Sequence, residues 1–239
     1  MSLPARDPAF DGQHVVITGV GRAGQAGEVV AQVFAAAGAH LHLLDRDPGI
    51  AERAAAIGPR ATPWQIDLTD LPALQAVAAR IGEAANGRVA ALLNVAGGFA
   101  MSGPIAESDP EIWHKMFALN LTTAYYATRS FLPMVRAVPG TVLFIGSQAS
   151  LPGGKSAEMA AYAAAKAGVI SLMRSVAQEE KAHGVRVNAV APSAIRTVAN
   201  LDSMGDRFKY VERDEFAVAL LQLCAPSARR ITGQVIELG

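Results

Sequence analysis

Short apolar runs alternate with long alanine-rich segments along the whole chain. The first apolar run, 14–18, lies between two glycines, and apolar residues at helical spacing follow it over 25–37. The run at 89–95 is continuously apolar, which is typical of a strand covered on both faces. The pattern predicts strands at 14–18, 41–44, 62–66, 89–95, 141–145, 185–190 and 234–238. It predicts helices at 25–37, 50–57, 71–85, 110–117, 122–138, 160–183 and 215–224.

This strand–helix alternation predicts an α/β fold with a doubly wound parallel sheet of the Rossmann-like type. About seven strands would be joined by right-handed crossovers, with helices on both faces. No repeat or Pro/Gly-rich linker divides the chain, so residues 1–239 are predicted to form one domain. Ligands of such sheets bind beyond the carboxyl ends of the strands, where the strand order reverses. The functional residues are therefore expected directly after the strands.

Composition excludes several classes of function. Hydrophobic residues make up 51% of the chain, and 21 basic residues balance 21 acidic ones, so no basic field exists for nucleic acid. The single cysteine excludes an intrachain disulfide and a cysteine zinc site. His40 and His42 share a strand face but have no third ligand nearby, so no metal is expected. With neither a signal peptide nor an apolar run long enough for a membrane span, we expect a soluble cytoplasmic protein.

A glycine-rich turn follows the first predicted strand. Glycines there permit a tight turn, let a pyrophosphate approach the backbone, and let the next helix pack close to the sheet. The helix N-terminus adds free N–H groups and a partial positive charge. A plain strand–helix turn is the alternative interpretation. The candidate phosphate-binding residues are Gly19, Gly24, Gln25, Ala26 and Gly27.

Two acids follow the next strands. Asp45 ends the second strand, where a carboxylate can accept the ribose hydroxyls of an adenosine and repel a 2′-phosphate, which favours NAD over NADP. Arg46 and Arg22 could instead hold a 2′-phosphate, and Asp45 could be a solvated loop acid. Asp67, after the third strand, could face an adenine or lie at a helix N-terminus.

Tyr162 and Lys166 are the most informative pair in the sequence. Their i, i+4 spacing places both side chains on one face of the predicted helix. A nearby ammonium lowers the pKa of a phenol, so the tyrosine could pass a proton between itself and an alkoxide or alcohol. The alternative is an amphipathic surface pair.

Two further polar residues are candidates for the same chemistry. Ser147 ends the fifth strand, and its hydroxyl could hydrogen-bond a substrate carbonyl or the oxyanion it becomes. Ser150 is the alternative, but Ser147 is preferred because it follows the strand directly. A lone loop serine is more often structural, and Asn120, at the start of the 122–138 helix, is more often a cap.

Taken in order, these residues resemble the short-chain dehydrogenase/reductase family over essentially the whole chain. Each matching segment alone is weak evidence for the family, but eight segments in the expected order are a specific signature of it. They are Thr18-Gly19 to Gly27, Asp45, Asp67-Leu68, Asn94-Val-Ala-Gly97, Asn120, Ser147, Tyr162-x-x-x-Lys166 and Asn188-Ala-Val-Ala-Pro192 with Thr197.

The resemblance implies roles that spacing alone does not give. Ser147, Tyr162 and Lys166 would form the catalytic centre, with Asn120 completing a proton relay and Lys166 also holding the nicotinamide ribose. Asn94, Ala96 and Gly97 would line the cofactor. Those flanking the nicotinamide carboxamide would be Pro192, Ile195 and Thr197.

The chain departs from the family pattern at several points. Gln25 stands where the second glycine belongs, and the turn is two residues longer, so Gly24 is expected to take over the close approach. Ser147 lies 15 residues before Tyr162, which requires a two-residue insertion over 152–159. Ser193 replaces a glycine, and the substrate lid at 198–212 is short and polar.

The sequence therefore predicts an oxidoreductase that moves hydride between NAD, or less readily NADP, and a small carbonyl or secondary-alcohol substrate. By resemblance, the apolar helix face at 125–131 would join two or four copies into a homodimer or homotetramer. The altered glycine turn, Ser193 and the short lid also permit a non-catalytic nucleotide-binding regulatory protein. A lyase or dehalogenase on the same fold is less favoured, because it would normally lose the phosphate turn and the lysine.

Overall fold

Seven parallel strands form a single sheet in the computed structural model, which describes residues 8–207 and 209–239. The strand order is β3-β2-β1-β4-β5-β6-β7, so it reverses between β1 and β4. The strands are β1 (His14–Thr18), β2 (His40–Asp45), β3 (Ala61–Gln65), β4 (Ala91–Asn94), β5 (Thr141–Ile145), β6 (Arg186–Pro192) and β7 (Val235–Leu238). The doubly wound, Rossmann-like sheet expected from the sequence is confirmed.

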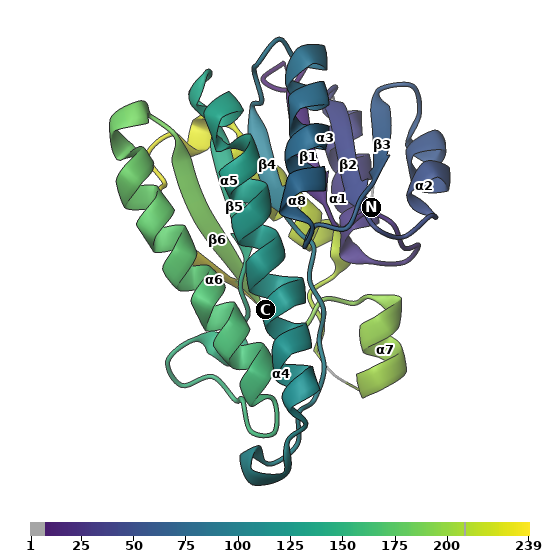
Figure 1. Cartoon of the computed structure of the whole chain (residues 1–239), viewed down its shortest axis with the longest axis vertical. Coiled ribbons are helices and arrows are strands. Elements are labelled where there is room, and N and C mark those ends of the chain that lie inside the picture. The colour runs from purple at the N-terminus through teal and green to yellow at the C-terminus, as the bar shows by residue number, and fades with distance from the viewer. Residues whose placement is uncertain (1–7, 208) are drawn as a thin grey trace.

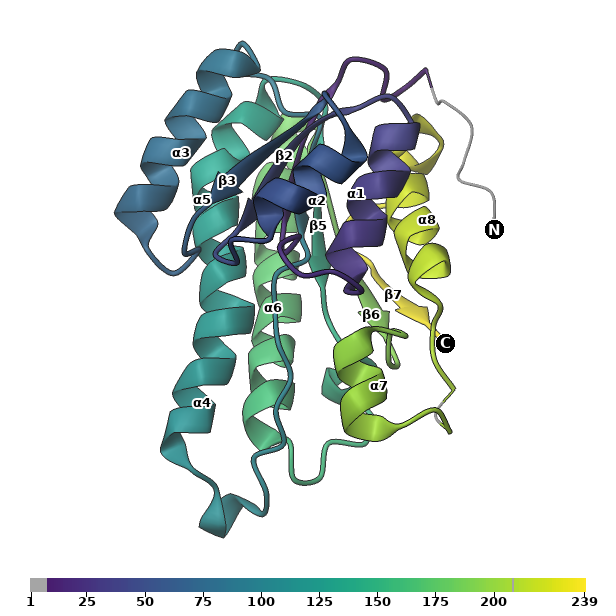
Figure 2. The same ribbon diagram turned by 90° about the vertical axis from the view of Figure 1, so that its right-hand side faces the viewer.

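Helices cover both faces of this sheet. In Figures 1 and 2, α3, α5 and α6 pack on one face, and α1 and α8 pack on the other. The helices are α1 (Ala26–Ala36), α2 (Ile50–Ile57), α3 (Leu71–Ala84), α4 (Pro110–Phe117), α5 (Thr123–Arg136), α6 (Ala160–Glu179), α7 (Val198–Met204) and α8 (Arg213–Cys224). The alternation along each strand divides the apolar side chains between two cores, because neighbouring residues point to opposite faces. Val15 joins the α1/α8 core, and Val16 joins the α3/α5/α6 core.

The structure corrects three expectations from the sequence. A single π-helical turn, Ala118–Thr122, joins α4 to α5, so the two helices that the sequence separates are continuous. The 198–212 segment, expected to be a short polar lid, contains a helix that the sequence did not predict, α7. Phe131 is fully buried whereas Tyr125 is 44% exposed, so the 125–131 segment does not present one apolar face.

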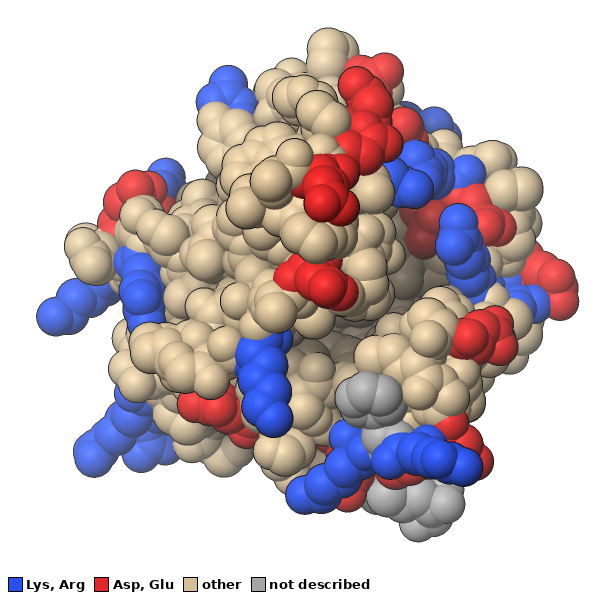
Figure 3. Space-filling view, turned by 90° about the horizontal axis from the view of Figure 1, so that it is seen from below, with Lys and Arg blue, Asp and Glu red and all other residues tan. Residues whose placement is uncertain are grey.

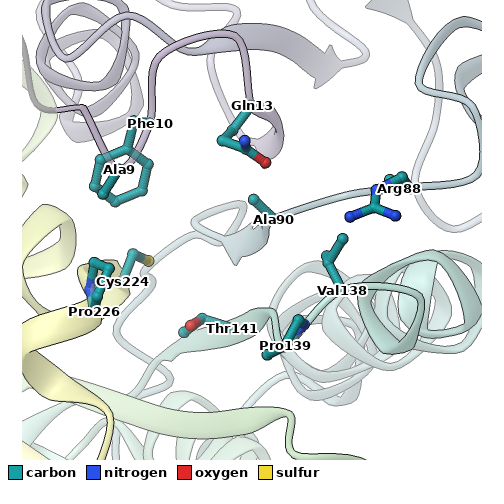
Figure 4. A pocket seen from close by; sticks show the side chains of 10 residues that line it. All are labelled: Ala9, Phe10, Gln13, Arg88, Ala90, Val138, Pro139, Thr141, Cys224 and Pro226. Carbon is teal, nitrogen blue, oxygen red and sulfur yellow. The ribbon is translucent and has the colours of Figure 1, made fainter.

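The carboxyl ends of the strands meet at the lower end of Figure 1, beside α7 and the N-terminus of α6. Figure 3 looks onto this end and shows a hollow near its middle, walled mainly by uncharged side chains. A separate cavity of about 250 Å³ lies at the opposite end of the sheet, where Phe10, Thr141 and buried Cys224 line it (Figure 4). None of the helices in the described residues is long and apolar enough to cross a membrane.

Candidate active site

The turn after β1 brings two strands into close backbone contact. Gly19 has φ +82°, and a Cβ there would lie 2.6 Å from the backbone N and Cα of Ala96. A Cβ at Gly27 would overlap the carbonyl oxygen of Gly19. A side chain at Gly19 would push the turn away from the backbone that follows β4, and one at Gly27 would push α1 away from the turn. These two glycines are therefore required for this close packing.

The remaining residues of the turn lie between α1 and α7. Gln25 is the N-cap of α1 but makes no capping bond with its side chain, and Ala26 is the first helical residue. Gly24, at φ +72°, accepts a hydrogen bond from the Val198 N–H at 3.1 Å. The first residue of α7 is thus fastened to the position that the sequence identified as taking over the close approach.

Asn94 ends β4 with an unsatisfied polar atom. Its Nδ2 donates to Thr128 Oγ1 at 3.2 Å, but its buried Oδ1 has no partner within the described residues. Nearby, Thr18 Oγ1 accepts from the Ala96 N–H at 3.1 Å and fixes the chain that leaves β4. An unpartnered buried acceptor costs free energy unless a donor reaches it, so Asn94 Oδ1 is a candidate ligand-binding atom.

Asp45 lies at the end of β2, facing the glycine turn. Its Oδ2 accepts from the Gly21 N–H at 2.8 Å, and its Oδ1 accepts from the Asp47 N–H at 2.9 Å. Arg22 pairs with Asp47 at 3.4 Å. Two backbone N–H groups therefore hold the Asp45 carboxylate beside the turn.

Asp67 lies after β3, away from these groups. Its Oδ1 accepts from the N–H and the hydroxyl of Thr69, and these bonds lower its pKa, with a smaller contribution from the charge of Arg46. Leu68 is buried in the α3/α5/α6 core. The N-cap of α3 is Asp70 rather than Asp67. Within the described residues, no hydrogen bond links Asp67 to the glycine turn.

Tyr162 and Lys166 lie on the first turns of α6. Lys166 is only 5% exposed, and its Nζ donates to the Ile145 carbonyl at 2.9 Å, 6.0 Å from the centroid of the Tyr162 ring. Burial lowers the pKa of Lys166 to about 8. The two side chains do share one face of the helix, as their spacing predicts.

The pKa of Tyr162 differs from the sequence-based expectation. It is raised rather than lowered, because burial disfavours the phenolate, and a hydrogen bond with Ser147 acts in the opposite direction. The ammonium of Lys166 is directed at the Ile145 carbonyl, with its Nζ 6.0 Å from the centroid of the Tyr162 ring. The expected net lowering of the Tyr162 pKa is therefore wrong, because burial is the largest effect on this phenol.

Asn120 lies in the π-helical turn rather than at a helix cap. Its Nδ2 donates to the carbonyls of Gly98, at 3.0 Å, and Met116, at 2.9 Å, while its Oδ1 accepts from the Gly98 N–H at 3.2 Å. A Cβ at Gly97 would lie 2.7 Å from Asn120 Oδ1 and 3.3 Å from Lys166 Nζ. Asn120 and Lys166 thus converge on the backbone at Gly97. Single π-turns are frequently found at functional sites.

The two candidate serines are in different environments. Ser147 is 3% exposed, its Oγ accepts from the Ala149 N–H at 3.3 Å, and it lies close enough to Tyr162 to lower the pKa of that phenol. Ser150 Oγ donates to the Ser147 carbonyl at 2.7 Å. The hydroxyl beside Tyr162 is therefore that of Ser147.

The chain after β6 forms the other side of this end of the sheet. Pro192 ends β6, and Thr197 caps α7 by accepting from the Asn200 N–H at 3.2 Å. Ile195 forms an isolated bridge with Val211, and its carbonyl accepts from Asn200 Nδ2 at 2.8 Å. These contacts hold the entry to α7 in place.

Sequence reasoning missed one residue that touches this cluster. Phe99 packs edge-to-face on Tyr162, with ring centroids 5.0 Å apart and planes at 86°. No short motif marks a lone phenylalanine in a loop; the only signal is its position five residues after Asn94.

The fold and these groups together define a class of protein, the dinucleotide-binding oxidoreductases built on a parallel α/β sheet. The family model for short chain dehydrogenases matches residues 13–206. The chain belongs to the short-chain dehydrogenase family.

Individual relatives agree with this assignment. The chain is 32% identical over 244 residues to galactitol 2-dehydrogenase (L-tagatose-forming) of Cereibacter sphaeroides, covering 96% of this chain and 94% of the relative. A short chain dehydrogenase of Escherichia coli complexed with NADPH superposes with TM-score 0.88 at 24% identity, over 98% of this chain and 99% of the other. The 3-ketoacyl-(acyl-carrier-protein) reductase of Brucella melitensis complexed with NADH superposes with TM-score 0.83 at 27% identity, over 95% of this chain and 97% of the other.

Proposed function

We propose that this protein interconverts a secondary alcohol and a carbonyl compound, using a nicotinamide dinucleotide. The observation that carries the proposal is that the buried Ser147 and Tyr162 lie together at the carboxyl end of the sheet, with Lys166 one helical turn away. A hydroxyl, a phenol and an amine in one buried corner suit proton transfer to or from an oxygen atom.

The residues present fit a nicotinamide dinucleotide. The close approach of Gly19 to Ala96 leaves backbone for a pyrophosphate to contact, and the unpartnered Asn94 Oδ1 offers an acceptor to a ribose hydroxyl. The remaining holding residues would be Gly24, Gln25, Ala26, Gly27, Asp45, Arg46, Asp67, Leu68, Gly97, Lys166, Pro192, Ile195 and Thr197. When bound, the nicotinamide supplies or accepts hydride.

The side chains then have separate tasks. Ser147 donates a hydrogen bond to the substrate oxygen and holds it beside the phenol. Because burial raises the pKa of Tyr162, the phenol keeps its proton at neutral pH and can donate it to the developing alkoxide. Lys166 offers an ammonium that stabilises phenolate once its bond to the Ile145 carbonyl is exchanged, and Asn120 holds the adjacent backbone for a proton relay.

Replacing Tyr162 tests the proposal. Tyr162→Phe removes the proton donor and leaves the ring, so turnover should fall by at least about 10³-fold while nucleotide affinity, measured by calorimetry, stays nearly unchanged. Full activity in this variant would refute the mechanism. Nucleotide binding without turnover of any alcohol or ketone by the unmodified protein would favour the non-catalytic regulatory alternative.

We also propose that NAD is preferred over NADP. The carboxylate of Asp45, fixed by the Gly21 and Asp47 N–H groups, would lie close to a 2′-phosphate and repel it. Rates with NADH and NADPH check this preference directly, and Asp45→Ser should shift the ratio of kcat/KM toward NADPH by about tenfold or more. A strong preference of the unmodified protein for NADPH would show that Arg22 and Arg46 decide the choice.

The cellular setting is part of the same proposal. We infer a cytoplasmic enzyme with a small-molecule substrate that works as a homodimer or homotetramer. Supporting the assembly, two large aromatic side chains on the continuous α4–α5 helix, Trp113 and Tyr125, are 41% and 44% exposed.

A further inference from the structure

Phe99 is fixed beside the proposed reacting groups by anchors on both sides. On one side, Gly98 exchanges hydrogen bonds with Asn120 through both its N–H and its carbonyl. On the other, the N–H groups of Ser102 and Gly103 donate to the Glu158 carbonyl at 2.7 and 3.0 Å. Despite these anchors the Phe99 side chain is 37% exposed, so one part of the ring packs on Tyr162 and another part faces the solvent.

The surroundings of Phe99 and Tyr162 are apolar. A small cluster built on Met116, Ala161 and Ala165 packs against Tyr162, Ala100 and other partly buried apolar residues of α4 and its flanks. A group that enters this corner therefore meets apolar surface from this cluster and from Phe99, beside the polar atoms of Ser147 and Tyr162. Burial of apolar surface stabilises such a contact by roughly 25 cal/mol per Å².

Polar side chains on the neighbouring segments are already hydrogen-bonded to the main chain. Gln148 Nε2 donates to the Leu238 carbonyl at 3.2 Å, Ser150 Oγ donates to the Ser147 carbonyl, and Asn200 Nδ2 donates to the Ile195 carbonyl. A polyol brings several hydroxyl groups, each of which loses its water on binding and needs a partner in return. These bonds occupy the hydroxyl proton of Ser150 and N–H groups of Gln148 and Asn200, which leaves fewer donors for the hydroxyl groups of a polyol.

We propose that Phe99 is a specificity-determining residue and that the preferred substrate carries an apolar group next to the reacting carbon. The inference rests on the proposed function, because it takes the substrate oxygen to lie at Ser147 and Tyr162. The substrate class then differs from a polyol such as the one named for the galactitol 2-dehydrogenase relative.

Two six-carbon alcohols test this choice with the full chain. Oxidation of 2-hexanol transfers a hydride from carbon 2 to the oxidised nicotinamide and releases the hydroxyl proton, giving 2-hexanone, the reduced nicotinamide and H⁺. Galactitol has the same number of carbons and a hydroxyl on each. Initial rates with NAD⁺ and NADP⁺ should give a kcat/KM for 2-hexanol at least about tenfold above that for galactitol.

Variants of Phe99 test whether its ring is responsible for the preference for 2-hexanol over galactitol. Phe99→Ala should raise KM for 2-hexanol by about five- to tenfold with a smaller change in kcat, and Phe99→Leu should recover most of the loss. The pH profile of kcat should be unchanged, because Tyr162 keeps its hydrogen bond to Ser147. Ile231→Ala is the matched control, since Ile231 is equally exposed at 37% and lies outside this cluster.

The outcomes separate the inference from the function it rests on. A higher kcat/KM for galactitol overturns the inference and supports the proposed function. An equal loss of kcat for both alcohols in Phe99→Ala, with a shifted pH profile, also overturns it, because the ring then only supports Tyr162. If neither these alcohols nor a wider panel of ketones is turned over, the proposed function fails together with the inference.

Discussion

Gly97 occupies the point where two polar side chains of the candidate site converge. A Cβ there would lie 2.7 Å from Asn120 Oδ1, which is bonded to the Gly98 N–H and cannot move without breaking that bond. Gly97→Ala should therefore displace Asn120 and Lys166 and lower kcat by about 100-fold, with little change in Tm. Steady-state kinetics and thermal unfolding measure the two effects.

Gly82→Ala is the control for this prediction, because the atom nearest to the added Cβ belongs to a flexible side chain. At Gly82, in α3, a Cβ would lie 3.3 Å from the sulfur of Met134, the flexible end of a side chain. Gly82→Ala should keep full activity and equal or slightly greater stability, since alanine favours the helix by roughly 0.5–1 kcal/mol. Activity of Gly97→Ala matching that of Gly82→Ala would contradict the assigned role.

At the scale of single residues, the sequence predicted that Tyr162 and Lys166 share a helix face, but it did not predict how their surroundings shift the tyrosine pKa. The spacing of Tyr162 and Lys166 places them on one helix face, because helix geometry is local. The direction of the tyrosine pKa shift depends on burial by residues distant in the chain, and on the Ile145 carbonyl that holds Lys166. The spacing of Tyr162 and Lys166 predicts neither the burial of the phenol nor the hydrogen bond of Lys166 to the Ile145 carbonyl.

The β1–β2 strand pair carries a histidine cluster with a consequence for stability. His14 Nδ1 and His42 Nε2 are hydrogen-bonded at 3.0 Å, and the ring of His40 stacks on His14. Burial, together with the neighbouring imidazoles, lowers the pKa of His42 from 6.5 to about 4. Within the described residues, no group of three or more His, Cys, Asp or Glu side chains that could hold a metal ion is found.

This cluster should make the fold acid-sensitive. The unfolded chain takes up the His42 proton near pH 6.5, but the folded chain does so only near pH 4. The stabilising contribution is thus complete above pH 6.5 and is lost progressively as the pH falls to about 4, for a total of about 3 kcal/mol. Urea unfolding of His42→Leu should show a shallower decline over this range. The exposed His183→Leu is the control, and equal slopes in both variants would contradict the prediction.

Among the secondary-structure elements, the regular strands and helices were predicted from apolar periodicity, whereas the π-helical turn and α7 were not. The strands and most helices follow from apolar spacing because each buries one face. The π-helical turn at Ala118–Thr122 adds one residue to a helical turn, which apolar spacing does not register. Helix α7 was missed because most of its residues are polar or small, and its start is fixed by the Thr197 cap and the contact of Val198 with Gly24.

For the whole molecule, the exposed aromatics of α4 and α5 give a prediction about assembly. A stable interface buries roughly 800 Å² on each partner and is enriched in aromatic side chains. If the α4–α5 helix joins two copies, a charge at Trp113 has to be buried without a partner. Trp113→Glu should therefore shift the protein to monomers in sedimentation velocity, whereas Ile231→Glu should not. A monomeric unmodified protein would contradict the proposal.

The sequence by itself determined the sheet, the order of its elements and the chemical types gathered at the strand ends, because these depend on periodicity and on residues close together in the chain. The tertiary structure alone decided that Asn120 is hydrogen-bonded to Gly98 and that Phe99 packs on Tyr162. Those contacts join segments separated by tens of residues. Their geometry depends on how the loops pack against one another, which no local pattern encodes.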